Sequence, residues 1–86
     1  MTTPTIYRTN GTSEPFVFKA RYPTLDEMQA VVEGYIKAVY ISDADVMIVD
    51  DEGAIKVGRQ LNAQASKLAR QAIYGNVIVM PRRLLR

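Results

Sequence analysis

Residues 35–49 read Tyr35-Ile36-Lys37-Ala38-Val39-Tyr40-Ile41, then Ser42-Asp43-Ala44-Asp45, then Val46-Met47-Ile48-Val49, and this segment decides the fold. Its first seven residues are rich in β-branched and aromatic side chains, which favour strands. The next four are polar turn formers. The apolar run 46–49 indicates a short central strand that is buried on both faces. The segment therefore predicts two successive strands of a sheet.

The segment 5–19 predicts a hairpin at the N-terminal side. Residues 5–9 are β-rich and are followed by Asn10-Gly11, the strongest short hairpin signal because both residues tolerate positive φ. Phe16-Val17-Phe18-Lys19 is expected to form the second strand. Pro15 lacks an N–H for the ladder and is expected at the start of that strand.

A helix is expected between the hairpin and residue 35. Thr24 is a good N-cap, and Glu27 three residues later completes a capping-box pattern. Gly34 is expected to end the helix, as glycine does at C′. The apolar stripe of this helix consists of Leu25, Met28, Val31, Val32 and Tyr35.

The C-terminal half predicts further turns, a second helix and a last strand. An acidic turn, Asp50-Asp51-Glu52-Gly53, precedes Ala54-Ile55-Lys56-Val57, which is expected to extend the sheet. Asn62 is expected to cap a helix over 63–71 whose buried face is Ala65, Leu68, Ala69 and Ala72. Asn76-Val77-Ile78-Val79-Met80 is the expected last strand, and Pro81 ends it.

Together these elements predict one α+β domain over residues 1–81. A four- or five-stranded, mainly antiparallel sheet packs one face against two short helices, and residues 82–86 form a basic C-terminal tail, either disordered or an arm that contacts another subunit. Few edge-protecting residues lie on the last strand, 76–80. Pairing of this edge, or packing of a sheet face, into a homodimer is therefore expected.

Composition limits the chemistry that the chain can perform. The 86 residues include no Cys and no His, which removes thiolate nucleophiles, the commonest general base and the commonest zinc ligands. We therefore expect no enzymatic activity, no metal and no cofactor. No run of about 18 apolar residues is present, so no membrane contact is expected. The N-terminal residues lack a secretory pattern, which favours a cytoplasmic location, that of the host cell if a phage encodes the chain.

The charge is divided along the chain. Residues 1–52 carry a formal charge of −5 and residues 53–86 carry +7, within a net charge of +2. Such a division can create a surface that attracts a polyanion or an acidic protein. The candidate residues for binding a polyanion or partner are Arg59, Lys67, Arg70, Arg82, Arg83 and Arg86. Solvation, or pairing with the acidic half of the same molecule, is the favoured alternative.

Two other features are weaker candidates. Tyr40 and Tyr35 lie five apart and are expected on opposite faces of one strand, so Tyr40 is a candidate aromatic anchor for a partner. Asp50, Asp51 and Glu52 together present oxygens that a hard cation requires. No EF-hand spacing is present, and a solvated turn before glycine is the favoured interpretation.

Several short motifs resemble one family. They are Glu33-Gly34-Tyr35-Ile36, Asp50-Asp51-Glu52-Gly53, Leu61-Asn62-Ala63-Gln64-Ala65-Ser66 and Ile73-Tyr74-Gly75-Asn76-Val77-Ile78-Val79. Over residues 23–80 the chain resembles a family of small domains of unknown function found mainly in phage and plasmid accessory genes. Members often have glycine where Glu33 stands, Asn at Asp50 and Lys at Ala54. The resemblance implies an α+β fold and a mobile-element setting, but no activity and no functional residue.

Three hypotheses for function follow. The first is a non-enzymatic phage or mobile-element protein that binds a host or phage protein and counters a host defence. The second is a nucleic-acid-binding accessory protein that uses the basic half and loses affinity steeply with salt. The third is a sponge that binds an anionic nucleotide at a dimer interface.

Overall fold

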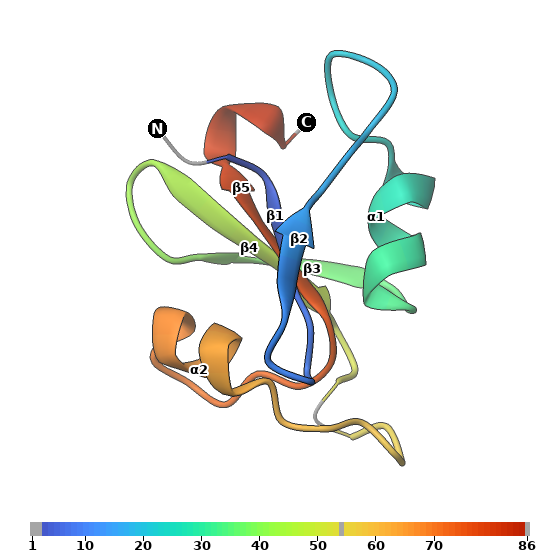
Figure 1. Cartoon of the computed structure of the whole chain (residues 1–86), viewed down its shortest axis with the longest axis vertical. Coiled ribbons are helices and arrows are strands. Elements are labelled where there is room, and N and C mark those ends of the chain that lie inside the picture. The colour runs from blue at the N-terminus through green and yellow to red at the C-terminus, as the bar shows by residue number, and fades with distance from the viewer. Residues whose placement is uncertain (1–2, 54, 86) are drawn as a thin grey trace.

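A computed structural model describes residues 3–53 and 55–85 of the chain. Within these ranges one antiparallel sheet of five strands has the order β2-β1-β5-β4-β3, and two α-helices flank it (Figure 1). The α+β class and the mainly antiparallel sheet are therefore confirmed. In chain order the elements are β1 (Thr5–Tyr7), β2 (Ser13–Pro15), α1 (Leu25–Val32), β3 (Ile36–Tyr40), β4 (Asp45–Asp50), α2 (Ala63–Ala69), β5 (Val77–Pro81) and the 3₁₀ helix η1 (Arg82–Leu84).

The two most apolar strands, β4 and β5, lie side by side in the interior of the sheet. Every residue of β5 is buried, and so are residues 46–50 of β4. The prediction that 46–49 form a central strand is confirmed. The prediction that 76–80 form an edge was wrong, because a strand that is apolar at every position requires cover on both faces.

The two helices lie on opposite faces of the sheet (Figure 1). Met28 and Val32 of α1 pack in one core with Val46, Ile48 and the even-numbered residues of β5. Ala65 of α2 packs in the other core with Met47 and Val49. The prediction that both helices cover one face was wrong, because successive side chains of β4 and β5 point to opposite faces and each face buries an apolar layer.

The N-terminal hairpin is tighter than expected. Its turn is closed by the bond from Arg8 N to Thr12 O (2.9 Å), and Gly11 has φ +89°. This turn directs Ser13–Pro15 back along β1, so the prediction of a second strand over 16–19 was wrong, as was the placement of Pro15 at a strand start. The turn, and not the apolar content of 16–18, sets the pairing register.

Both helices begin at the predicted caps and end on a left-handed residue. The capping box of α1 is confirmed, with Glu27 N donating to Thr24 Oγ1 (3.1 Å) and Thr24 N donating to Glu27 Oε1 (2.9 Å). The left-handed residue is Glu33 (φ 63°), one position before the predicted Gly34. Helix α2 starts after Asn62 as predicted but ends at Ala69, with Arg70 at φ 57°.

The apolar face of α2 is smaller than its sequence pattern predicts. Ala65 is fully buried and Ala69 is half-buried, whereas Leu68 and Ala72 are exposed. Asn62 supplies the missing attachment from a fully buried position. Its Nδ2 donates to Tyr7 O and Gly75 O, each at 2.9 Å, and its Oδ1 accepts from Ala65 N at 3.1 Å. The helix is therefore held through its N-cap and through Ser66, whose Oγ accepts from Ile73 N at 2.9 Å.

The C-terminal residues pack against the domain. Residues 82–84, expected as part of a tail, form η1, and Leu84 is only 7% exposed in the core beside α1. Leu85 packs against the same core, while Arg86 lies outside the described residues. Among the residues described, no helix combines the length and apolar character that crossing a bilayer demands.

Candidate functional site

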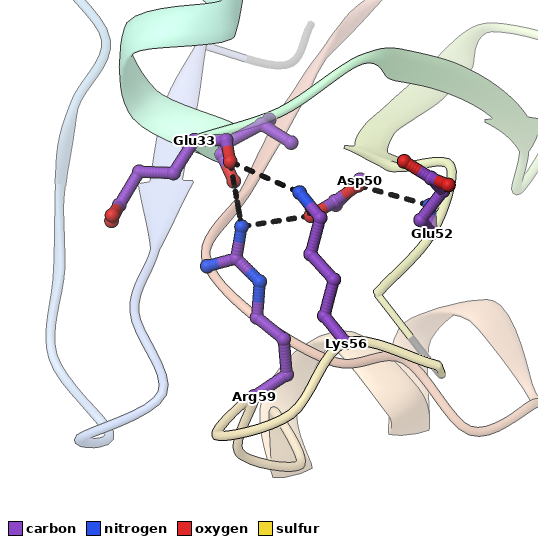
Figure 2. A network of polar contacts seen from close by, with 6 residues as sticks. Glu33, Asp50, Glu52, Lys56 and Arg59 are labelled. Atoms are coloured by element: carbon purple, nitrogen blue, oxygen red, sulfur yellow. Dashed lines mark hydrogen bonds and ion pairs between the residues drawn. The ribbon is translucent and has the colours of Figure 1, made fainter.

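The acidic turn after β4 holds an ion-pair network instead of a solvated carboxylate cluster. Asp50 ends β4, and its side chain is fully buried. Its Oδ2 accepts from Lys56 Nζ and from Arg59 Nη2, each at 2.8 Å. Its Oδ1 accepts from Glu52 N at 2.9 Å (Figure 2). One carboxylate thus ties both basic residues of the 51–60 loop to the end of a central strand.

The same two cations close the C-terminal end of α1. Arg59 Nη2 donates to Glu33 O (2.7 Å) and Val32 O (3.2 Å), and Lys56 Nζ donates to Glu33 O (3.3 Å) (Figure 2). Helix C-termini leave carbonyl groups without intrahelical partners and favour positive charge. The network therefore joins α1, β4 and the loop at one point.

Gly34 is required by this network more than by helix geometry. A side chain at this position would place a Cβ 2.9 Å from both Asp50 carboxylate oxygens and against Lys56 Nζ. Such separations are closer than real Cβ atoms tolerate. The glycine that the sequence marks as a helix end thus allows the close approach of the ion pairs.

The charge state of Asp50 follows from two opposed effects. Burial raises the pKa of its carboxyl, but the hydrogen bonds from Lys56, the Glu52 N–H and Arg59 outweigh burial and hold the pKa below its ordinary value. The carboxylate is therefore ionised at neutral pH and fully occupied by donors. It supplies no free oxygens for a cation, and the described residues contain no cluster of three or more His, Cys, Asp or Glu that could hold a metal.

The loop held by this network exposes apolar side chains. Ile55 is 79% exposed and Val57 is fully exposed. The loop that follows β4, drawn in yellow, reaches away from the body of the molecule (Figure 1). The predicted strand over 54–57 was wrong: Ile55 N and Lys56 N both donate to Glu52 O at 3.1 Å in a turn, and Ala54 lies outside the described residues. Aspartate, glutamate and glycine at 50–53 favour this turn over continued pairing.

A hollow of about 390 Å³ adjoins the loop on the side of α1. Tyr35, Lys56 and Glu52 line it, together with Gln29, Glu33 and Gly34. Tyr35 is itself 72% exposed. We call Tyr35, Ile55 and Val57 the loop surface. Tyr35 and Lys56 both line the shallow hollow, and Ile55 and Val57 flank Lys56 in the chain. On this basis the loop surface is the candidate functional site among the described residues.

The six basic candidates are not brought together. Arg59 is engaged with Asp50, Val32 and Glu33, so its guanidinium belongs to the network. Lys67 is exposed on α2 and Arg70 is exposed directly after it. Helix α2 lies far from the η1 segment that carries Arg82 and Arg83 (Figure 1). Arg86 lies outside the described residues. The division of charge in the sequence therefore does not become a single basic patch.

Tyr40 is exposed, as a partner anchor requires, but it already has a neighbour. The Arg82 guanidinium carbon lies 4.8 Å from the centre of the Tyr40 ring, and Arg82 Nη1 donates to Asp43 O at 3.2 Å. The contact is a cation–π interaction between β3 and η1. Tyr40 remains a candidate anchor, with its ring partly covered by a residue proposed for polyanion binding.

A second hollow, of about 200 Å³, lies on the α2 face beside Lys37, Val39 and Tyr74. Ligand pockets generally have about 300–1,000 Å³. Lys37 is the one cationic residue in its lining, and Asp50 and Asp51 also line it. This arrangement does not favour an anionic nucleotide.

Comparison with known proteins assigns the chain to a family. A family model described as Domain of unknown function (DUF3846) matches residues 4–83. The chain belongs to the DUF3846 family. This confirms the resemblance to a family of small domains of unknown function, and the match also covers the N-terminal hairpin and the first two residues of η1. Searches among curated proteins and among solved structures found no match to this DUF3846 chain.

Sequence reasoning missed the loop surface of this DUF3846 domain. Ile55 and Val57 alternate with Lys56, which is the pattern of a half-buried strand. The sequence feature that could have indicated a loop is the polar turn 50–53. It separates residues 54–57 from β4, so these residues need not pair with that strand. The role of Asp50 was hidden because its partners lie 6 and 9 residues away in a loop.

Proposed function

We propose that this DUF3846 domain is a non-enzymatic accessory protein that acts by binding another protein through the loop surface. The observation that carries the proposal is the full exposure of Val57, with Ile55 near it in the chain, on a loop whose base is fixed by two ion pairs to the buried Asp50 carboxylate. Exposed apolar groups at a fixed position support binding, since little ordering entropy is lost on association.

The biological setting belongs to the same proposal. The likeness of the Gly-Tyr-Ile, acidic-turn and Ile-x-Gly motifs to domains of phage and plasmid accessory genes supports a mobile-element origin. A partner of host or phage origin in the host cytoplasm, and a role in blunting a host defence, follow as the working hypothesis. The dispersed basic residues favour a protein partner over a polyanion.

The experiment is a comparative pull-down from phage-infected cell lysate with the tagged full chain. The test variant is Ile55→Ser with Val57→Ser, and the matched control is Val17→Ser with Leu25→Ser, which removes two other exposed apolar side chains. We expect one protein to be retained by the wild type and the control, and at least about tenfold less by the loop variant, a loss of about 1.4 kcal/mol.

Two results would contradict the proposal. One is equal retention of the same proteins by the loop variant and the control. The other is repeated failure of the wild-type chain to retain any protein, although circular dichroism shows that it is folded.

A further inference from the structure

Strand β3 is an outer strand of the sheet. Its hydrogen bonds to β4 determine which of its backbone groups point toward the free edge. Asp51 N donates to Tyr35 O (2.8 Å) and Ile41 N donates to Asp45 O (3.3 Å). In an antiparallel pair, residues that bond to the neighbouring strand alternate with residues that do not. Residues 35, 37, 39 and 41 therefore bond toward β4. The N–H and C=O groups of Ile36, Ala38 and Tyr40 point away from it.

The two edges of the sheet differ in how they resist pairing. Strand β2 is three residues long, ends in Pro15, and carries Glu14 in an ion pair with Arg8. A short strand with proline and charge is a usual way to block an edge. Strand β3 is five residues long, has no proline, and carries one charge, Lys37. The edge of β3 is the one that remains able to pair.

The sequence of this edge is self-complementary. Residues 35–41 read Tyr-Ile-Lys-Ala-Val-Tyr-Ile, so that each tyrosine stands at the same distance from Ala38 as an isoleucine on the other side. An antiparallel copy centred on Ala38 places Ile36 opposite Tyr40 and Tyr35 opposite Ile41, and sets Lys37 opposite Val39. Aromatic residues opposite β-branched residues are favourable cross-strand pairs, and no like charges stand directly opposite. In the same register, the outward N–H and C=O groups of Ile36, Ala38 and Tyr40 form hydrogen bonds with those of the second copy.

We propose that β3 pairs antiparallel with β3 of a second copy of this chain, about a two-fold axis at Ala38, to give one continuous sheet. The two proposals can be tested separately, because the pull-down variants change Ile55 and Val57, which lie outside the paired strands, although Tyr35 belongs to both surfaces. Stable interfaces usually bury about 1,200–2,000 Å². A seam of seven residues per copy is short by that measure, so we expect a dimer that forms with rising concentration.

The first test is hydrogen exchange of backbone amides in the wild-type chain, followed by NMR at micromolar and at millimolar concentration. The amides of Ile36, Ala38 and Tyr40 are expected to exchange quickly in the monomer and to slow at least about tenfold at high concentration. The amides of Lys37 and Val39, which bond to β4, serve as internal controls that are protected at both concentrations. Equal exchange of the outward amides at both concentrations would overturn the proposal.

The second test uses charge at the symmetry axis, followed by sedimentation velocity. Ala38→Lys and Ala38→Glu each place like charges directly opposite in a homodimer, so each alone is expected to be monomeric. An equimolar mixture of the two is expected to form a dimer. The matched control is Ser13→Lys on the β2 edge, which is expected to associate like the wild type.

Three outcomes of these tests would contradict the proposed pairing. Association of Ala38→Lys equal to that of the wild type, or loss of association in Ser13→Lys, would place the interface elsewhere. A wild-type chain that stays monomeric at millimolar concentration would overturn the dimer proposal. It would be overturned even if the amides of Ile36, Ala38 and Tyr40 were protected by binding a different protein. If the Ala38 variants fail to fold by circular dichroism, the wild-type exchange measurement decides.

Discussion

At the scale of single residues, the main structural finding is the double use of Lys56 and Arg59. Both bind the buried Asp50 carboxylate, and both also donate to carbonyl groups at the end of α1. Breaking a buried ion pair from one side costs more than the pair contributes, because the remaining charges lose their partner. Asp50 is therefore the residue on which the loop surface depends most.

We predict that Asp50→Asn lowers the free energy of unfolding at pH 7 by about 3 kcal/mol, since two cations lose a charged acceptor. Urea unfolding measures the change. Asp51→Asn, at an exposed neighbour, is the matched control and is expected to stay within about 0.5 kcal/mol of the wild type. A loss equal to that of the control would contradict the assigned role of Asp50.

The stability difference between the wild type and Asp50→Asn is expected to depend on pH in a defined direction. The pKa of Asp50 is lowered in the folded protein, so its stabilisation is fully present above the unfolded value, about 3.9, and is lost as pH falls through the folded value. The stability difference between wild type and Asp50→Asn is thus expected to be constant near neutrality and to shrink in acid below about pH 4. Parallel curves at every pH would show that another group is responsible.

We predict that Glu33→Gly stabilises the fold. Glu33 has φ 63°, a conformation that costs an L-residue about 1 kcal/mol and costs glycine little. Part of this gain is offset by the greater freedom of glycine in the unfolded chain, so the expected increase is about 0.5 kcal/mol. Glu33→Ala, which removes the side chain but keeps the backbone strain, is expected to show no increase in the midpoint of thermal unfolding.

At the scale of elements, η1 places a larger buried side chain in the core than α2 does. Helix α2 contributes one fully buried side chain, Ala65, and is attached by the buried Asn62 amide and by the Ser66 hydroxyl. The three-residue η1, expected as part of a tail, delivers Leu84 to the core beneath α1. Burial area, not element length, determines which of the two contributes more to stability.

We therefore predict that Leu84→Ala lowers the free energy of unfolding by about 2–4 kcal/mol, the usual cost of truncating a buried leucine. Leu68→Ala on α2 is the matched control. Leu68 is 44% exposed, so its truncation is expected to cost less than about 1 kcal/mol. Urea unfolding distinguishes the two, and a Leu84 effect no larger than that of Leu68 would show that the C-terminal residues do not stabilise the domain.

At the scale of the whole molecule, the folded arrangement disperses the charge that the sequence concentrates. The described basic candidates occupy the network, α2 and η1, over a body whose extents are 34 × 24 × 21 Å. Polyanion affinity grows with the number of phosphates contacted together. Because the described basic candidates lie at three separated places, we expect few of them to contact the phosphates of one nucleic acid together.

We accordingly predict that gel-shift titration with double-stranded DNA gives weak binding at low salt that disappears at physiological ionic strength. Lys67→Gln with Arg70→Gln is compared with Arg82→Gln with Arg83→Gln. Each pair is expected to reduce the weak binding by a similar, small factor. A tight complex that either pair alone abolishes would instead support the nucleic-acid hypothesis.

Local features of the sequence predicted much of the fold. Thr24 with Glu27, Asn62, and the apolar runs of β4 and β5 each identify an element through interactions among near neighbours. The candidate site was less predictable. Asp50 and Arg59 are 9 residues apart. The sequence does not indicate that the Asp50 carboxylate is buried, or that Lys56 and Arg59 both bind it. Helix caps and buried strands can be predicted from local sequence patterns. Ion-pair partners cannot, because they depend on the path of the loop that brings the two residues together.

What the sequence determined by itself is the two helix N-caps, the strands β1, β3, β4 and β5, and the antiparallel α+β class. These depend on side-chain periodicity and on backbone preferences that act over a few residues. Tertiary structure alone decided the strand order, the placement of one helix on each face, and the exposure of Ile55 and Val57. The physical reason is that burial is a property of the assembled layers, so a residue's own neighbours in the chain cannot specify which surface it meets.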